Sequence, residues 1–329
     1  MPERANARRR SRLIGALAGL ALAAGCGSDE AGSPEFASEP APAPADFPAA
    51  DGRSLEQILA DANPDPDLVV LPAGGVVTEG RQRFGFGIFT VDGEQVGGAE
   101  VALYAAPAGG GEAQGPFPAR IESLETDPAF ATETTSGDPD AAKVVYASQL
   151  EVEDRGELRL VAVARDGDEL RSARIPSVVV KDYDEIPEPG DEAPVTHTPT
   201  SDDVGDLGQI DTRVPHDTMH ETDLAEALGE NPVVLLFATP ALCESRVCGP
   251  VVDVAEQVKA DYGDEVEFIH AEIYEQNNPN EGVRPHVADY GLPTEPWLFV
   301  IDDSGRVSTR IEGAFSVDEL ESAVAEVAP

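Results

Sequence analysis

Two neighbouring cysteines are the residues of this sequence that are best suited to chemistry. Cys243 and Cys248 are separated by four residues, and the third cysteine of the sequence is Cys26. A thiolate can attack a disulfide and form a mixed disulfide with another protein, so a close cysteine pair can exchange electrons with protein thiols. All five histidines also follow residue 196. Chemistry that needs a free thiol or an imidazole is therefore expected in the C-terminal part of the chain.

The reactivity of the pair depends on how well each thiolate is stabilised. The periodicity of residues 250–262 predicts a helix, and a cysteine at a helix N-terminus is activated by the unpaired backbone N–H groups there. Cys248 has this position, so we expect it to be the nucleophile and Cys243 the resolving thiol. Arg246 favours the thiolate, whereas Glu244 and the negative surroundings oppose it. The alternative is a permanent disulfide that only shapes the loop, although so short a ring gives little entropic stabilisation.

Strands and helices alternate around the two cysteines. Residues 233–237 are a continuous apolar run, as in a strand that is buried on both faces. Ser316 and Glu319 have the spacing of a capping box before a final helix. The pattern further predicts short helices at 224–228 and 283–290 and strands at 266–271, 297–302 and 306–312. The loop between the first strand and the helix at 250–262 holds both cysteines.

This order of elements resembles that of the thioredoxin family. The sequence Cys-Gly-Pro from Cys248 looks like the start of the family's CGPC motif, and Thr-Glu-Pro-Trp, which ends at Trp297, matches the place of its cis-proline. The resemblance covers residues 216–329. It implies an α/β thioredoxin-like fold, thiol–disulfide oxidoreductase activity on protein clients, and no cofactor. It also implies that Pro296 is cis, faces the cysteine pair and holds the substrate strand.

The chain departs from the family pattern near the motif. The position of the family's second cysteine holds Val251, and the partner thiol is instead Cys243, which gives a CX4C spacing. Val247 stands in place of an aromatic residue, and Leu236 replaces a buried acid that accepts a proton in the family. The domain is therefore either a tuned oxidoreductase or a non-catalytic module that uses this fold to bind proteins.

A metal site on the cysteine pair is a further possibility. Copper chaperones of this fold combine a CX3C motif with a distant histidine, and His270 or His286 would supply that ligand here. The spacing does not match, so we predict no metal. His270 lies in a predicted strand and is expected to be packed, whereas His220 is expected to be an exposed polar residue. We expect Trp297 to belong to the core.

The amino terminus has the composition of a bacterial export signal. Five arginines at residues 4–12 precede an uncharged run at residues 13–25, which is shorter than the roughly 20 residues of a membrane-spanning helix. The run ends in Leu-Ala-Ala-Gly-Cys, which resembles the lipobox of bacterial lipoproteins, with Leu22 one place early. The resemblance implies that Cys26 carries lipid and anchors the protein to the outer face of the cell membrane, where disulfides persist. The alternative is a secretory signal followed by a chance cysteine.

Between the export signal and the cysteine pair, residues 67–182 show short runs with a period of two. Strands are predicted at 83–89, 99–104, 143–152, 157–164 and 173–180, with turns such as Asp92-Gly93 between them. This pattern indicates an all-β sandwich, and it loosely resembles the immunoglobulin-like modules of bacterial surface proteins. The segment contains no cysteine or histidine. We interpret it as a spacer or a binding module.

Composition shifts divide the chain into five parts. We expect a signal peptide at 1–25, a Pro-rich and acidic linker with a possible short helix at 26–66, the sandwich at 67–182, a second linker at 183–215 and the thioredoxin-like domain at 216–329. The formal charge of −41 argues against nucleic acid as a partner, because phosphate binding requires clustered basic residues. The sequence thus predicts an exported, lipid-anchored thiol–disulfide oxidoreductase, with a non-catalytic binding module as the alternative.

Overall fold

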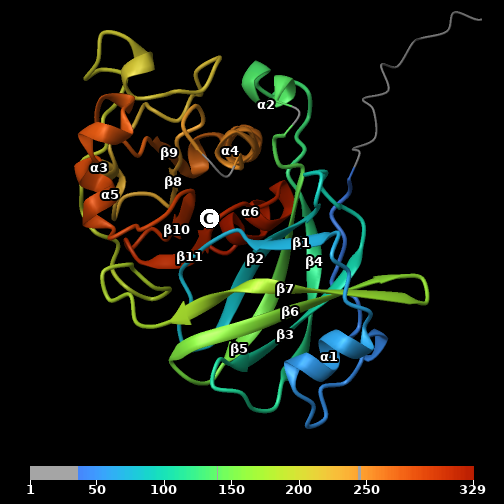
Figure 1. The fold of residues 1–329 in the computed structure, drawn as a ribbon. Coiled ribbons are helices and arrows are strands. Elements are labelled where there is room, and N and C mark those ends of the chain that lie inside the picture. The colour runs from blue at the N-terminus through green and yellow to red at the C-terminus, as the bar shows by residue number, and fades with distance from the viewer. Residues whose placement is uncertain (1–35, 139, 244–245) are drawn as a thin grey trace, which may run out of the picture. The chain divides into compact units, whose positions relative to one another are not determined.

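Two β-sheets organise the part of the chain that the computed structural model describes, residues 36–138, 140–243 and 246–329 (Figure 1). The larger sheet has seven strands and the smaller sheet has four. The chain divides into the units Met1–Ser33 and Pro34–Pro329, so both sheets belong to the same unit. The predicted export signal at 1–25 and the predicted lipidation site Cys26 lie outside the described residues.

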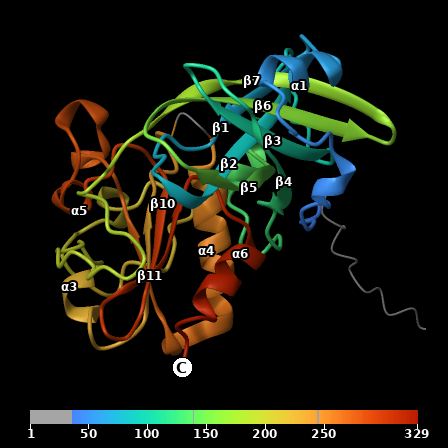
Figure 2. The same cartoon turned by 90° about the horizontal axis from the view of Figure 1, so that it is seen from below.

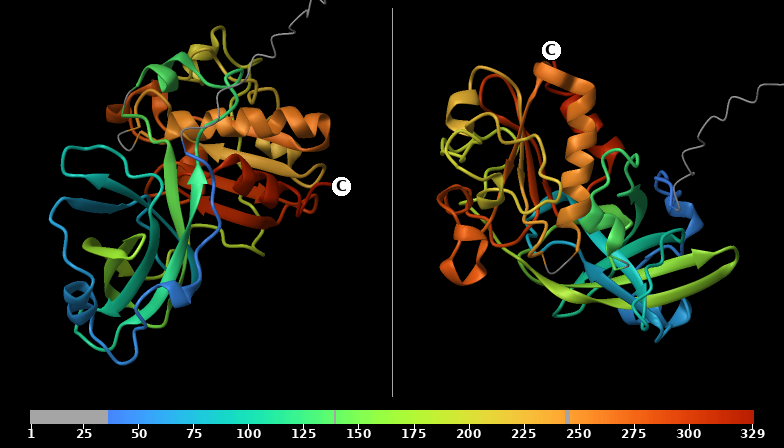
Figure 3. Two further views of the ribbon diagram at one scale, coloured as in Figure 1. Left: turned by 90° about the vertical axis from the view of Figure 1, so that its right-hand side faces the viewer. Right: turned by 90° about the horizontal axis from the view of Figure 1, so that it is seen from above.

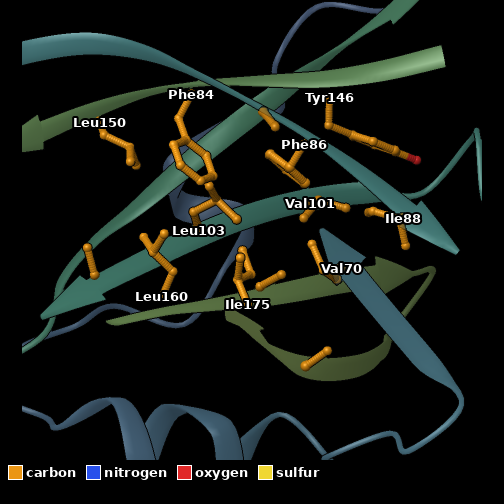
Figure 4. Packing of buried hydrophobic residues seen from close by; sticks show 14 of the residues in the cluster. Val70, Phe84, Phe86, Ile88, Val101, Leu103, Tyr146, Leu150, Leu160 and Ile175 are labelled. Carbon is orange, nitrogen blue, oxygen red and sulfur yellow. The ribbon is translucent and has the colours of Figure 1, made fainter. Parts of the chain in front are cut away.

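The larger sheet is antiparallel throughout, with the strand order β1-β2-β5-β4-β3-β6-β7. Its strands are β1 (Leu68–Pro72), β2 (Gly80–Thr90), β3 (Glu100–Pro107), β4 (Gln114–Ser123), β5 (Val144–Val152), β6 (Gly156–Asp166) and β7 (Glu169–Val180). Segments on either side of β1 form bridges to Ser172 and Val180 of β7, so the two ends of the sheet meet. The strands surround one apolar core, in which Phe86, Leu103 and Tyr146 are fully buried (Figure 4).

This arrangement differs from the immunoglobulin-like sandwich that the sequence predicts. A sandwich consists of two packed sheets, whereas here the hydrogen bonding continues through all seven strands. Alternating apolar residues bury one face of each strand in both architectures, so a period of two does not distinguish them. Neither β1 nor β4 is predicted from the sequence. Pro116 and Pro118 lie in β4, a central strand, where proline is normally avoided.

Residues 36–66 pack on the larger sheet instead of extending away from it. The possible short helix forms as α1 (Leu55–Asp61), and Ser54 caps it by accepting a hydrogen bond from the backbone N–H of Gln57. Ile58 is fully buried and lies in one apolar cluster with Phe47 and Tyr104. The Tyr104 hydroxyl also donates to the carbonyl oxygen of Pro48 at 2.6 Å. A few well-placed apolar residues therefore fix a segment whose average composition predicts a spacer.

The smaller sheet has the strand order and directions of a thioredoxin fold. Its strands are β8 (Val233–Phe237), β9 (Glu267–Ala271), β10 (Trp297–Ile301) and β11 (Val307–Glu312), in the order β11-β10-β8-β9. β8 and β9 are parallel, and β10 is antiparallel to both of its neighbours. The helices of this part are α3 (Leu224–Ala227), α4 (Cys248–Tyr262), α5 (Pro285–Asp289) and α6 (Val317–Val324).

Helices cover both faces of the smaller sheet, with α4 and α6 on one side and α3 and α5 on the other (Figure 2). Alternate residues of β8 belong to opposite cores: Val234 and Leu236 pack with α4 and α6, whereas Leu235 and Phe237 pack with α3 and α5. All five residues of β8 are buried, as its continuous apolar run predicts. α4 and α6 lie against each other on their shared face (Figure 3). No helix in the described ranges has both the length and the apolar character needed to cross a membrane.

Residues 183–215 follow a fixed path along the smaller sheet. Gly190 donates a backbone hydrogen bond to Val307 at 2.8 Å, and Val307 donates to Asp191 at 3.0 Å, so this segment pairs beside the edge strand β11. Ile186 and Ile210 are buried. The acidic, Pro-rich composition predicts an extended linker, but backbone groups of the segment find partners at an exposed strand edge and hold it in place.

Contacts between α6 and the larger sheet modify the predicted capping box. The Ser316 hydroxyl accepts a hydrogen bond from the N–H of Glu319 at 3.0 Å, which caps α6 as expected. The Glu319 carboxylate, however, binds Arg83 with an N–O distance of 2.7 Å and also contacts Arg120. Only half of the box therefore forms, because Glu319 pairs with two arginines of the larger sheet.

Candidate functional site

A disulfide joins Cys243 and Cys248 at the N-terminal end of α4. The chain leaves β8 and reaches Cys243, whose backbone N–H donates to the carbonyl oxygen of Thr239 at 3.1 Å. Cys248 is the first residue of α4, two residues earlier than the sequence predicts, and Pro250 is the third. Proline is tolerated there because the first four N–H groups of a helix have no acceptor within the helix.

The two cysteine residues differ in their exposure to solvent. Cys248 is fully buried in the apolar cluster between the smaller sheet and α4, whereas Cys243 packs against the same cluster and is partly exposed. Val251 and Leu236, which replace the second cysteine and the buried acid of the thioredoxin pattern, are both fully buried in this cluster. The interior side of the disulfide is therefore apolar where the family has polar groups.

The segment before β10 brings a carboxylate to the disulfide. The peptide bond between Glu295 and Pro296 is cis, as the resemblance implies, and Pro296 is buried. An oxygen of Glu295, Oε2, lies 3.8 Å from the sulfur of Cys248, and Oε1 accepts a hydrogen bond from the Tyr274 hydroxyl at 3.1 Å. Glu295 is not among the site residues predicted from the sequence. Its signal is its position beside Pro296, the residue that the resemblance places next to the cysteines.

Residues from the larger-sheet part of the chain cover the N-terminal end of α4. The guanidinium of Arg246 pairs with Asp138 at 2.6 Å and with Asp140 at 3.4 Å, just after the short helix α2 (Glu133–Gly137; Figure 1). A Cβ atom added to Gly249 would lie 2.8 Å from the Thr135 hydroxyl. The positive charge of Arg246, which is expected from the sequence to stabilise the thiolate, is therefore neutralised by two carboxylates. Glu244, the acid expected to oppose it, lies outside the described residues.

The prediction that His220 is exposed is wrong, because this residue is only 3% exposed. The backbone N–H of His270 in β9 donates to the carbonyl oxygen of Met219 at 3.0 Å, which holds the segment around His220 against the sheet. His270 is buried, as predicted, with Nδ1 2.7 Å from Asp217 Oδ2. Burial lowers the pKa of His270, but the charge of Asp217 and this hydrogen bond outweigh it and raise the pKa to about 10.

His286 and Trp297 are both buried in the interior. The Nε2 atom of His286 donates to the carbonyl oxygen of Glu272 at 2.8 Å, and Trp297 is 1% exposed, in the core as expected. Within the described part of the chain, neither His270 nor His286 shares a group of potential metal ligands with the cysteines. The structure thus brings together Cys243, Cys248 and Glu295, the residue before Pro296, and it places His220 and His270 in a separate cluster.

Comparisons with known proteins give a partial likeness. No protein-family model matches the sequence, and no curated protein matches it. Among solved structures, the chain is similar to a thiol:disulfide interchange protein of the thioredoxin family from Chlorobium tepidum TLS, with 17% sequence identity and a TM-score of 0.30 over 43% of this chain and 97% of that chain.

A second similar structure comes from the same species. It is a protein described as a proposed thiol:disulfide interchange protein DsbE, with 18% identity and a TM-score of 0.32 over 43% of this chain and 98% of that chain. Scores and identities of this size carry no inference about activity. The thioredoxin-like arrangement of the C-terminal part therefore rests on its own strand order, on the cysteines at the start of α4 and on the cis-proline before β10.

Proposed function

We propose that this protein exchanges disulfides with protein thiols through Cys243 and Cys248. The observation that carries the proposal is the bonded cysteine pair at the start of a long helix, with one partly exposed member and a carboxylate 3.8 Å from the other. A disulfide that only stabilised the loop would need neither feature.

The difference in exposure assigns the two sulfurs different roles. A thiolate of a client attacks the partly exposed sulfur of Cys243, a client–Cys243 disulfide forms, and the Cys243–Cys248 bond breaks. Its electron pair goes to Cys248, whose thiolate is stabilised by the N–H groups at the start of α4. This order is the reverse of the one predicted from the sequence. The helix terminus still matters, but it favours Cys248 as a leaving group and resolving thiol.

Glu295 is suited to move the proton that this exchange requires. In the opposite direction, the thiolate of Cys243 in the reduced protein attacks a client disulfide, forms the client–Cys243 disulfide and releases one client thiolate. Oε2 of Glu295 then accepts the proton of the Cys248 thiol, and the resulting thiolate attacks Cys243, which re-forms the Cys243–Cys248 bond and releases the second client thiolate. The Tyr274 hydroxyl orients the carboxylate from the other side. Glu295 thereby takes the role of the buried acid that Leu236 replaces, from a different strand end.

Two observations favour a second candidate, a non-catalytic binding module with a permanent disulfide. Cys248 is fully buried, and residues near α2 cover the start of α4. Both features restrict the approach of a client to one side of the disulfide. In this function the thioredoxin-like part would bind its partner without exchange.

Reduction of insulin by dithiothreitol, followed as turbidity, distinguishes the two functions. We expect catalytic amounts of the protein to accelerate the reduction, and we expect the reduction potential of the Cys243–Cys248 pair to lie above about −300 mV, since structural disulfides typically lie below this value. A lower potential together with no acceleration would establish the non-catalytic module.

Replacement of Glu295 tests its role as proton acceptor in the same assay. Glu295→Gln is expected to slow turnover by about 100-fold at pH 6, because positioned acid–base groups typically contribute this much or more. The defect should shrink above a pH of about 8.5, where cysteine thiols ionise without help. Glu281→Gln, at an exposed position, serves as the matched control. A defect of equal size at every pH would reject proton transfer by Glu295.

We further propose that the protein acts outside the cytoplasm, anchored through lipid on Cys26, with the larger sheet as a spacer or client-docking part. The export signal and the lipobox-like sequence support this location. In cells, Cys26→Ser is expected to move the protein from the membrane fraction to the soluble fraction. Retention of the variant in the membrane fraction would contradict anchoring by this residue.

A further inference from the structure

A buried cluster of four potential metal ligands lies apart from the cysteine pair. Asp211, Asp217, His220 and His270 each offer one ligand atom, and these atoms all lie within 4.8 Å of one another. The four residues are at most 5% exposed. None of them takes part in the proposed disulfide exchange.

Backbone hydrogen bonds hold both carboxylates of the cluster in place. Asp211 accepts the N–H of Arg213 at 2.7 Å on Oδ1 and the N–H of Asp217 at 2.8 Å on Oδ2. Asp217 accepts the N–H of Met219 at 2.9 Å on Oδ1. Each of these oxygens has a second lone pair. The loop thus presents two fixed carboxylates to the edge of the smaller sheet.

The tautomer of His270 suits a metal ligand. Its Nε2 lies 3.1 Å from the carbonyl oxygen of Ala238, which can only accept a hydrogen bond, so Nε2 carries a proton. Metal-binding histidines commonly donate from the second nitrogen to a carbonyl in this way, which orients the ring. The other nitrogen, Nδ1, then faces Asp217 Oδ2 at 2.7 Å.

His220 provides independent evidence for a ligand at this place. Both of its ring nitrogens are buried and have no hydrogen-bond partner among the described residues. Nε2 nevertheless lies 3.2 Å from Asp217 Oδ1 and 3.7 Å from Asp211 Oδ2, without the geometry of a hydrogen bond. A buried polar group without a partner is costly, by about 1–3 kcal/mol. A cation between Nε2 of this imidazole and the carboxylates would give that nitrogen a partner and would bind both carboxylates.

We infer that Asp211, Asp217, His220 and His270 bind a zinc ion. Tetrahedral zinc, with ligands at about 2.0–2.2 Å, separates its ligand atoms by roughly 3.3–3.6 Å. The His220 contacts at 3.2 and 3.7 Å already approach this spacing, and the contact between His270 and Asp217 must widen. Two imidazoles disfavour calcium and magnesium, which prefer oxygen ligands, and two carboxylates neutralise the charge of zinc.

The competing occupant of the cluster is a proton on each histidine. Burial raises the pKa of Asp217, but the charge of His270 holds it well below its usual range, and the pKa of His220 is raised by its neighbouring carboxylates despite burial. Zinc would displace these protons and link the segment at 211–220 to β9. His216, with Nδ1 3.3 Å from Asp211 Oδ2, lies at the more exposed side of the cluster.

Metal analysis of the purified, oxidised full chain tests this site. After treatment with a chelator and addition of zinc sulfate, we expect one zinc ion per chain. The melting temperature should rise by about 5 °C at a free zinc concentration of 100 times Kd. Magnesium at the same concentration should give no rise. In the cobalt-substituted protein, visible absorption of a tetrahedral ion without a thiolate charge-transfer band would identify nitrogen and oxygen ligands.

Variants locate the ion within the chain. His220→Ala should lose the bound zinc and the rise in melting temperature, whereas His197→Ala, at an exposed histidine paired with Asp223, should keep both. The double variant Cys243→Ser/Cys248→Ser should also keep the zinc. Circular dichroism confirms that each variant is folded. Absence of stoichiometric zinc or cobalt in the folded wild-type protein, or retention of the ion by His220→Ala, would overturn the assignment.

Discussion

Cys248→Ser is expected to abolish turnover and to accumulate client proteins on Cys243 as mixed disulfides. The partly exposed sulfur of Cys243 can meet a client disulfide, and the variant lacks the buried thiol that would resolve the product. The measurement is the amount of covalent, thiol-sensitive adduct on non-reducing gels after incubation with a protein that contains a disulfide. Turnover in the insulin assay should fall to the uncatalysed rate.

The opposite variant determines the order of the two thiols. Cys243→Ser should also lose turnover but should form little adduct, because Cys248 is fully buried. The double variant Cys243→Ser/Cys248→Ser gives the background of the assay. If Cys243→Ser traps clients and Cys248→Ser does not, the order predicted from the sequence is correct and the one inferred from exposure is wrong.

Asp253→Ala is expected to destabilise the folded chain by about 3–5 kcal/mol. Asp253 lies in α4, is 1% exposed and accepts a hydrogen bond from Arg213 Nε at 2.9 Å. Its second oxygen accepts the N–H of Thr132 at 3.1 Å, and Arg213 also donates to the carbonyl oxygen of Phe130 at 2.6 Å. Removal of the carboxylate leaves the guanidinium buried without its counter-charge.

The size of this effect comes from the loss of hydration that buried charges suffer on folding, not from a strong attraction between Asp253 and Arg213. Burial raises the pKa of Asp253 even though Arg213 and the hydrogen bonds oppose this shift, so desolvation dominates. A buried pair of this kind contributes little compared with apolar residues, but loss of one partner is severe. Combining Asp253→Leu with Arg213→Met should therefore recover part of the stability that Asp253→Ala loses.

Urea unfolding measures the free energy of unfolding of Asp253→Ala and of the double variant. Trp297 is the single tryptophan and is 1% exposed, so its fluorescence reports unfolding of the smaller sheet. The matched control is Glu192→Ala, which removes an exposed partner of Arg306 and should change the free energy of unfolding by less than about 1 kcal/mol. A loss for Asp253→Ala no larger than that of the control would show that the buried pair does not hold α4 to its neighbours.

The sequence is sufficient to predict the elements of the thioredoxin-like part. A continuous apolar run determines that β8 is buried on both faces, and the spacing of Val251, Val254 and Val258 determines the buried face of α4. The position of Pro296 at the entrance of β10 is likewise local information. Such features depend on residues within a few positions of one another, so the pattern of side chains specifies them directly.

Contacts between residues far apart in the sequence cannot be predicted from this local pattern. Glu319 has the spacing of a capping box but binds Arg83, which is 236 residues away. His220 is predicted to be a polar surface residue but is buried, because the neighbouring Met219 accepts a backbone hydrogen bond from His270 in β9. The same limit applies to the single curled sheet and to residues 36–66 and 183–215. Their average composition predicts spacers, whereas a few apolar contacts and strand-edge hydrogen bonds fix their path.

For the cysteine pair, the sequence alone determined the two thiols and the helix that begins beside them, because both depend on local spacing. Only the tertiary structure decided which sulfur is exposed, that Asp138 and Asp140 neutralise Arg246, and that Glu295 reaches the sulfur of Cys248. Exposure and electrostatic surroundings depend on segments that meet only after folding, so no local pattern contains them.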